Sequence, residues 1–138
     1  MTLTLHLQII GVLLVLLGLS HAFFNRYFRW REELAVVSLL TRQVFFVHSF
    51  FIGLGVVLSG VGTFLYAGAL LRPGVLNRPI LAGMTTFWLC RLLAQFFVYD
   101  SALWRGDRFR TFMHAVFILL WCYVTATYGC ALFTVWRP

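Results

Sequence analysis

Residues 43–71, QVFFVHSFFIGLGVVLSGVGTFLYAGALL, contain no Asp, Glu, Lys or Arg, and this stretch decides the class of fold. A helix needs about 20 mostly apolar residues to cross a bilayer, so the segment is long enough to span a membrane and to tilt. Three further segments meet the same requirement, namely residues 3–24, 80–99 and 111–136. The sequence therefore predicts an all-α integral membrane four-helix bundle, forming a single transmembrane domain over residues 1–138.

The composition excludes the main alternatives to a membrane protein. Hydrophobic residues make up 62% of the chain and charged residues 11%, against about 45–50% and 25% in soluble globular domains. Disordered chains are less hydrophobic, and disulfide scaffolds need more than the 3 cysteines present. The net charge of +7 comes from arginines beside the apolar segments, a pattern typical of contact with anionic lipids. We therefore expect membrane lipids as partners and no nucleic acid.

The arginines also predict the orientation in the membrane. The first and third connections contain seven of them, at positions 26, 29, 31, 42, 105, 108 and 110, whereas the opposite side has three, at positions 72, 78 and 137. Because basic connections stay in the cytoplasm, we expect a multi-pass protein of the cell inner (cytoplasmic) membrane with both termini outside.

The first connection, residues 25–42, contains a helical pattern of its own. Apolar side chains recur at helical spacing there, at Tyr27, Trp30, Leu34 and Val37, while the charged residues lie elsewhere. This pattern is typical of a short amphipathic helix lying in the membrane interface. In the third connection, Asp107 stands at the right distance from Thr111 to cap the fourth helix.

Each predicted span carries a stripe of mainly polar, small or aromatic residues along one face. These are Gly11, Leu14, Gly18, His21 and Asn25 on the first span; His48, Gly55, Ser59, Gly62 and Tyr66 on the second; Trp88, Arg91, Gln95 and Tyr99 on the third; and His114, Trp121, Thr125 and Tyr128 on the fourth. Polar residues in lipid turn toward the bundle interior. At 1.5 Å per residue, His21, His48, Arg91, Gln95 and His114 all fall in the cytoplasmic leaflet. We therefore expect a binding site for a ligand or partner there, formed by these five residues and Trp88.

Small residues on the second span predict a helix contact. Gly55, Ser59 and Gly62 match the small-xxx-small spacing of close helix packing. By the same reasoning, Gly53 and Gly60 lie on the other side of this helix and outside the contact.

Arg91 is the most informative single residue. An arginine near the middle of a membrane costs about 2.5–3.5 kcal/mol on insertion scales, and no acidic residue of the chain is expected at its depth. The side chain either snorkels, or bonds to Gln95 and backbone carbonyls, or binds an anion from outside the chain. That anion would be a lipid phosphate, a cofactor carboxylate or an acidic residue of a partner.

Most catalytic chemistry has no signature in this sequence. There is no C-x-x-C, H-E-x-x-H, G-x-S-x-G or P-loop motif. Cys90, Cys122 and Cys130 have the distribution of buried apolar thiols, and no metal site is expected. One cofactor alternative stays open, because haem b in a helical bundle needs two facing histidines at similar depth. His21, His48 and His114 are its candidate ligands, and Arg91 could contact a propionate.

Two stretches carry a resemblance to known proteins. Residues 40–48, LTRQVFFVH, and residues 95–100, QFFVYD, resemble those of small four-helix inner-membrane proteins of bacteria. The chain is also similar to the ergosterol-biosynthesis scaffold family, in length, in four helices, in an arginine where the second helix begins and in Phe97-Val98-Tyr99. That resemblance implies a protein that tethers enzymes and does not itself catalyse a reaction.

The sequence therefore favours a non-enzymatic membrane accessory or scaffold subunit. We expect it to bind partner helices, or a lipid or isoprenoid-like molecule, in the cytoplasmic leaflet, and to associate with other membrane subunits or with a second copy of itself. The first alternative is a b-type haem or quinone-site subunit of a membrane redox complex. The second is a small lipid-modifying enzyme that uses His or Arg at the head-group boundary.

Overall fold

The computed structural model describes residues 2–136, apart from the side chain of Asn25, and within that range it contains helices and no strands. The elements in chain order are α1 (Leu3–Tyr27), α2 (Trp30–Glu33), the 3-10 helix η1 (Leu34–Val36), α3 (Leu39–Leu70), α4 (Asn77–Phe97), the 3-10 helix η2 (Ser101–Leu103) and α5 (Arg108–Trp136). Four of them, α1, α3, α4 and α5, are long and apolar enough to cross a membrane. The predicted all-α fold with four spanning helices is confirmed, and the span boundaries move by a few residues.

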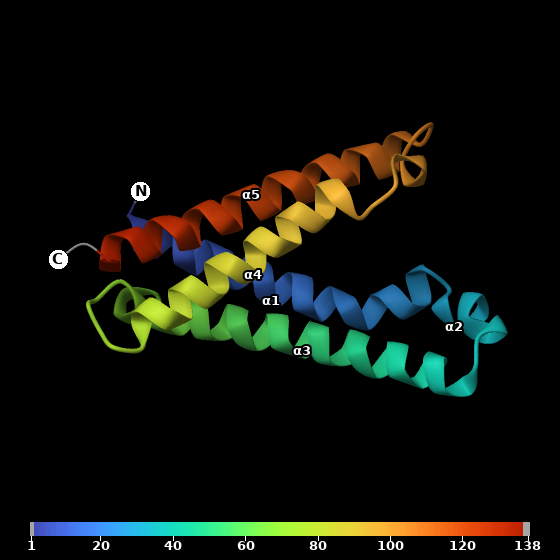
Figure 1. The fold of residues 1–138 in the computed structure, drawn as a ribbon, viewed down its shortest axis with the longest axis horizontal. Coiled ribbons are helices and arrows are strands. Elements are labelled where there is room, and N and C mark those ends of the chain that lie inside the picture. Colours follow the sequence, from blue (N-terminus) through green and yellow to red (C-terminus); the bar gives the residue numbers. More distant parts are fainter. Residues whose placement is uncertain (1, 137–138) are drawn as a thin grey trace. The chain divides into compact units, whose positions relative to one another are not determined.

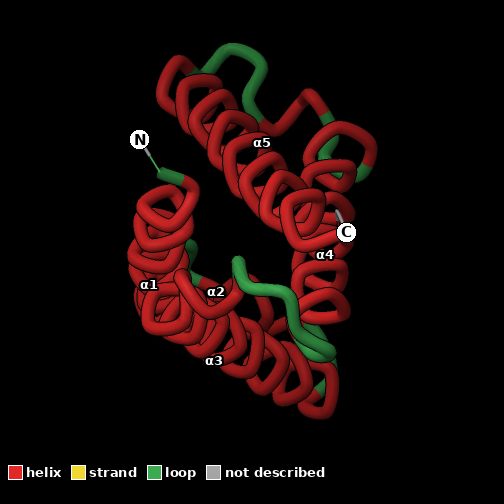
Figure 2. The backbone as a smooth tube through the Cα atoms, turned by 90° about the vertical axis from the view of Figure 1, so that its left-hand side faces the viewer, coloured by secondary structure: helices red, strands yellow, loops and turns green. Residues whose placement is uncertain are grey.

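The chain divides into two compact units, each built on a helical hairpin. The first unit, Leu5–Ala67, pairs α1 with α3, and the second contains α4 and α5 together with the N-terminal residues up to Thr4. Within each unit the two long helices run side by side, α1 (blue) along α3 (green) and α4 (yellow) along α5 (orange to red) (Figure 1). The tube view in Figure 2 shows the same elements from another side, with α2 in the connection between α1 and α3. The single transmembrane domain expected over residues 1–138 stays a prediction.

Glycines from both helices form the contact between α1 and α3. A Cβ atom built on Gly60 would lie 2.7 Å from the carbonyl oxygen of Gly11, and one built on Gly11 would lie 2.8 Å from that of Gly60. Gly18 and Gly53 meet in the same way, at 2.7 and 3.1 Å. Because the two pairs lie seven residues apart on each helix, the contact has the 3.5-residue periodicity of antiparallel coiled-coil packing. Small residues let the two backbones approach this closely.

The predicted contact face of the second span is therefore wrong for this hairpin. A Cβ atom on Gly55 or Gly62 would meet no atom within 4 Å, and Ser59 is only half-buried, whereas Gly53 and Gly60 are buried. The physical reason is the facing helix. The glycines of α1 repeat every seven residues, and only the seven-residue pair on α3 matches them in antiparallel register. On α1 the predicted face is confirmed at Gly11, Leu14 and Gly18, which are all buried, while His21 is half-buried and the side chain of Asn25 lies outside the described residues.

The connection between α1 and α3 contains a short helix, as the sequence predicts, reduced to α2 and η1. Of the four predicted apolar positions, Tyr27 instead ends α1 and is exposed, and Val37 follows η1. Trp30, Leu34 and Val37 are less exposed than the charged residues between them, and Arg29 forms an ion pair with Glu32. Trp30 stacks on Phe28, with 5.7 Å between ring centroids, and meets the ring of Phe45 on α3 edge-on at 4.8 Å. Phe28 in turn meets the ring of Phe24 on α1 at 5.7 Å, so ring contacts hold the connection against the ends of both helices.

The end of α3 and the start of α4 are tied together by one side chain. Asn77 Nδ2 donates to the carbonyl oxygens of Ala69 and Arg72, each at 2.8 Å. Ala69 lies in the last turn of α3, where helix carbonyls lack partners within the helix, and Arg72 lies in the turn that follows. One turn earlier, Tyr66 has non-helical backbone angles (φ −106°, ψ 16°), so α3 is kinked there.

Candidate functional site

The α4–α5 hairpin brings together most of the polar side chains that the sequence analysis selects. On α4, Trp88 and Gln95 are buried and Arg91 between them is half-buried. On α5, Trp121 and Tyr128 are buried and His114 is half-buried. The helical spacing of these residues places each set on one face of its helix. The predicted faces of the third and fourth spans therefore correspond to the side chains that the structure gathers within one hairpin.

A hydrogen-bonded chain runs from α4 to α5 through Gln95. Arg91 Nη1 donates to Gln95 Oε1 at 3.1 Å, and Gln95 Nε2 lies 2.7 Å from His114 Nδ1. Because arginine has only donors, the Gln95 oxygen must face Arg91 and its amide N–H₂ must face His114. Nδ1 of His114 is therefore the acceptor, which in the neutral imidazole leaves the ring proton on Nε2. Gln95, only 6% exposed, joins the two helices with both ends of its amide used.

Aromatic rings cover both ends of this chain. The Arg91 Cζ atom lies 4.8 Å from the ring centroid of Trp121 and 5.5 Å from that of Tyr99, both within cation–π distance. At the other end, the ring of Trp104 stacks on His114 with 3.7 Å between centroids and 16° between planes. Trp121 in turn stacks on Trp88, at 5.3 Å and 15°. The partners of Arg91 within the described residues are thus an amide and two rings, and none of them is an acid.

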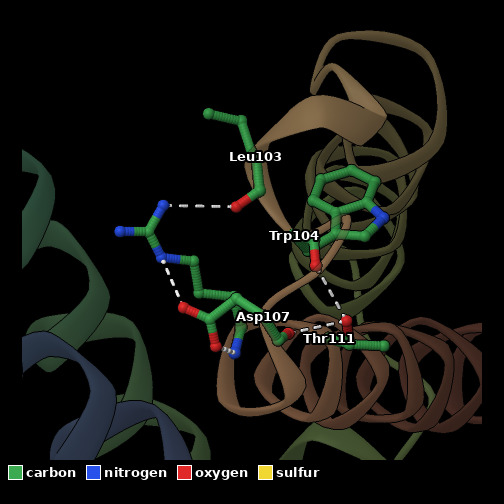
Figure 3. A network of polar contacts seen from close by, with 5 residues as sticks. Leu103, Trp104, Asp107 and Thr111 are labelled. Atoms are coloured by element: carbon green, nitrogen blue, oxygen red, sulfur yellow. Dashed lines mark hydrogen bonds and ion pairs between the residues drawn. The ribbon is translucent and has the colours of Figure 1, made fainter.

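The connection between α4 and α5 holds Trp104 in place (Figure 3). The predicted cap is confirmed, because Asp107 Oδ1 accepts from the backbone N–H of Arg110 at 3.1 Å. Thr111 Oγ1 donates to the carbonyl oxygens of Asp107 and Trp104, at 2.8 and 3.0 Å. The backbone of Trp104 is thereby tied to the first turn of α5, one turn before His114.

The polar site continues along the hairpin with three atoms that lack a partner. The indole nitrogens of Trp88 and Trp121 and the hydroxyl oxygen of Thr125 are buried, and no described residue forms a hydrogen bond with any of them. Trp88 and Trp121 are 2% and 3% exposed. Buried polar groups are normally hydrogen-bonded, so each orphaned group calls for an explanation.

The remaining predicted residues, His21 and His48, belong to the α1–α3 unit. In each, Nδ1 donates to the carbonyl oxygen four residues earlier, Leu17 at 3.0 Å and Val44 at 2.9 Å. His21 is half-buried and packs against Gly53, whereas His48 is exposed. The expectation that both share the depth of Arg91 stays a prediction, and so does their role as haem ligands.

Sequence reasoning missed Trp104. It lies in a connection, outside the helical periodicity that selects the other residues, and an aromatic residue just beyond a span end is common in membrane proteins. Its stacking on His114 depends on the path of the loop, which the Thr111 hydroxyl fixes. No signal in the sequence alone points to that contact.

The fold and this site define a class: an all-α protein built to cross a membrane several times, with a charged, hydrogen-bonded cluster inside one hairpin. Comparison with protein-family models, with curated proteins and with solved structures finds no match to this chain. Its function must therefore be argued from the site.

Proposed function

We propose that the protein is a non-catalytic accessory or scaffold subunit of a bacterial inner membrane, and that Arg91 binds the anionic head group of a lipid-like molecule. The charge balance around Arg91 supports this proposal. Its partners among the described residues, Gln95, Tyr99 and Trp121, are neutral. They lower the cost of placing a guanidinium in a spanning helix, but they do not cancel its charge. An anion from outside the chain would cancel it.

The direction of the Arg91 side chain favours a lipid phosphate over an acidic residue of a partner. Arg91 lies six residues before the end of α4 at Phe97, about 9 Å along the helix axis. Its guanidinium contacts Gln95, one turn nearer that end, and Tyr99, beyond it. The side chain therefore extends toward the head-group region, where lipid phosphates lie.

The distribution of arginines supports a position for this ligand in the cytoplasmic leaflet. The connection that follows α4 contains Arg105, Arg108 and Arg110, and the excess of arginine on this side supports a cytoplasmic position, with both chain termini outside. The likeness to the ergosterol-biosynthesis scaffold family is compatible with a protein that holds membrane partners together. Other membrane subunits or a second copy of the chain would then be its protein partners.

Thermal unfolding of the purified protein in detergent tests the proposal. We expect phosphatidylglycerol to raise the melting temperature of the parent, and diacylglycerol, which has the same acyl chains but no phosphate, to have little effect. Arg91→Leu should abolish the difference. Arg91→Lys should reduce it, because an ammonium group cannot form the two parallel hydrogen bonds that a guanidinium makes with phosphate.

Two variants sharpen this experiment. Gln95→Glu places a carboxylate beside Arg91 and should weaken phosphate binding while keeping the charged residue. Arg78→Leu is the matched control, since Arg78 is on the same helix, donates to the Val135 carbonyl at 3.3 Å and lies 5.7 Å from the Trp136 ring. If Arg91→Leu keeps the full effect of phosphatidylglycerol, the proposal is wrong. Loss of a co-purifying protein in this variant, with unchanged lipid response, would instead assign Arg91 to a partner's acid.

An absorption spectrum distinguishes the redox alternative from lipid binding. A b-type haem subunit using His21, His48 or His114 predicts a Soret band in the purified protein that shifts on reduction with dithionite. A colourless preparation whose melting temperature responds to phosphatidylglycerol through Arg91 would favour lipid binding over haem binding.

A further inference from the structure

Beside Arg91, the α4–α5 hairpin presents three buried groups able to donate hydrogen bonds, and the described residues offer none of them an acceptor. They are the indole N–H groups of Trp88 and Trp121 and the hydroxyl of Thr125. A donor left unpaired away from water is costly, and within a bilayer there is no bulk water to relieve it. Acceptors supplied from outside the chain would remove this cost.

The neighbouring rings do not supply that acceptor. An indole N–H lies in the plane of its ring, and the planes of Trp88 and Trp121 are within 15° of parallel, so neither N–H points at the face of the other ring. The same holds for Phe117, which is within 16° of parallel to Trp121. Phe87 is perpendicular to Trp88, but a benzene face is a much weaker acceptor than an oxygen atom.

The Thr125 hydroxyl lacks a bond that several other threonines of this chain form. Helical threonines commonly donate to the carbonyl four residues earlier, as do Thr63, Thr85 and Thr134, at 2.7–2.8 Å. Thr125 has no such bond. Its residue is half-buried, as is Arg91, so the cluster reaches the surface of the hairpin at these two residues.

We propose that Trp88, Trp121 and Thr125 donate hydrogen bonds to carbonyl oxygens of the molecule whose anionic group binds Arg91. This inference rests on the proposed function and adds the second recognised group of the ligand. Trp88 precedes Arg91 by three residues on α4, so it lies about 4.5 Å further from the head-group end of the helix. The ligand therefore carries its carbonyl on the acyl-chain side of its anion.

An ester-linked glycerophospholipid has this arrangement. Its ester carbonyls are joined to the phosphate through the glycerol unit and lie on the acyl-chain side of it. A prenylquinone is a second source of carbonyl oxygens, and it would offer them to the same donors without a phosphate.

Matched lipids test the inference on the full-length protein in detergent micelles. Diester and diether phosphatidylglycerol share the phosphate and differ in the two carbonyl oxygens. We expect the parent to bind the diester form about 3- to 10-fold more tightly, the effect of one ordinary hydrogen bond. Trp88→Phe, Trp121→Phe and Thr125→Val should each bring this ratio toward one. Trp136→Phe, an exposed tryptophan at the other end of the hairpin, should leave the ratio unchanged.

The outcomes separate this inference from the proposed function. If both phosphatidylglycerols bind the parent equally and Arg91→Leu weakens both, the phosphate site stands and an ester ligand is refuted. Binding of decylubiquinone then tests whether the carbonyl belongs to a quinone. If the same three substitutions weaken this binding, the carbonyl is assigned to a quinone. If they leave it unchanged, or if decylubiquinone does not bind, the inference is overturned. If Arg91→Leu weakens neither lipid, the proposed function fails. Because the diester and diether comparison needs only the parent protein, a variant that fails to fold does not prevent the test.

Discussion

Replacing Gly60 by alanine tests the glycine contact between α1 and α3. The new Cβ would lie 2.7 Å from the Gly11 oxygen and 2.8 Å from the Val15 nitrogen, against 3.4 Å or more for an ordinary contact. Both neighbours are backbone atoms, so no side chain can rotate away and the helices must separate by several tenths of an ångström. Overpacking of this kind costs about 1–3 kcal/mol, whereas exchanging glycine for alanine inside a helix gains about 1 kcal/mol.

Gly55→Ala on the same helix has the same gain in helix stability without the cost of overpacking, because its Cβ meets nothing within 4 Å. The difference between the two variants therefore isolates the packing term, and we expect Gly60→Ala to be less stable than Gly55→Ala by about 1–3 kcal/mol. Unfolding by sodium dodecyl sulfate in mixed micelles, followed by circular dichroism, measures this difference. Gly62→Ala serves as a second control. Unfolding free energies that agree to within about 0.5 kcal/mol, the usual effect of a surface substitution, would refute the close contact at Gly60.

Three further predictions concern the α4–α5 unit and the orientation. Asp107→Ala should lower stability by about 1 kcal/mol through loss of the cap on α5, and Asp107→Asn, which keeps an acceptor, should restore most of it in the same unfolding assay. Trp104→Ala should cost about 0.5–1.5 kcal/mol beyond its loss of buried area, the worth of an aromatic stack; a double-mutant cycle with His114→Ala measures this coupling, and additive effects would contradict the stacking. A reporter active only in the periplasm should work at either terminus and fail beside Arg105, and a periplasmic signal at Arg105 would reverse the proposed orientation.

The four spanning helices could be predicted because apolar length is a property of each segment by itself. The residues on the α4 and α5 faces could be predicted for a similar reason: Trp88, Arg91 and Gln95 share a face by helical periodicity alone. The contact face of α3 could not, because it depends on which side of another helix meets it. Gly55 and Gly53 are equally small, and only the seven-residue repeat of Gly11 and Gly18 on the facing helix selects between them.

The interactions inside the site depend on geometry that periodicity does not contain. The spacing of Arg91 and Gln95 indicates that they can touch, but the use of both ends of the Gln95 amide requires His114 to approach from another helix. Trp104 reaches His114 only because Thr111 holds the loop. The sequence could therefore name candidate residues for the polar site, and could not specify which atoms bond.

The two glycine pairs of α1 and α3 also limit how this hairpin can move. Sliding one helix along the other would carry Gly11 away from Gly60 and bring side chains such as Phe64 or Leu14 against the opposite backbone, where a single Cβ already has no room. Shear, the small sliding of packed helices that many switching proteins use, is thus blocked at two points along the contact. The two helices are therefore expected to move together along the glycine contact. Bending of α3 is expected instead at Tyr66, the residue with non-helical backbone angles beyond the last glycine pair.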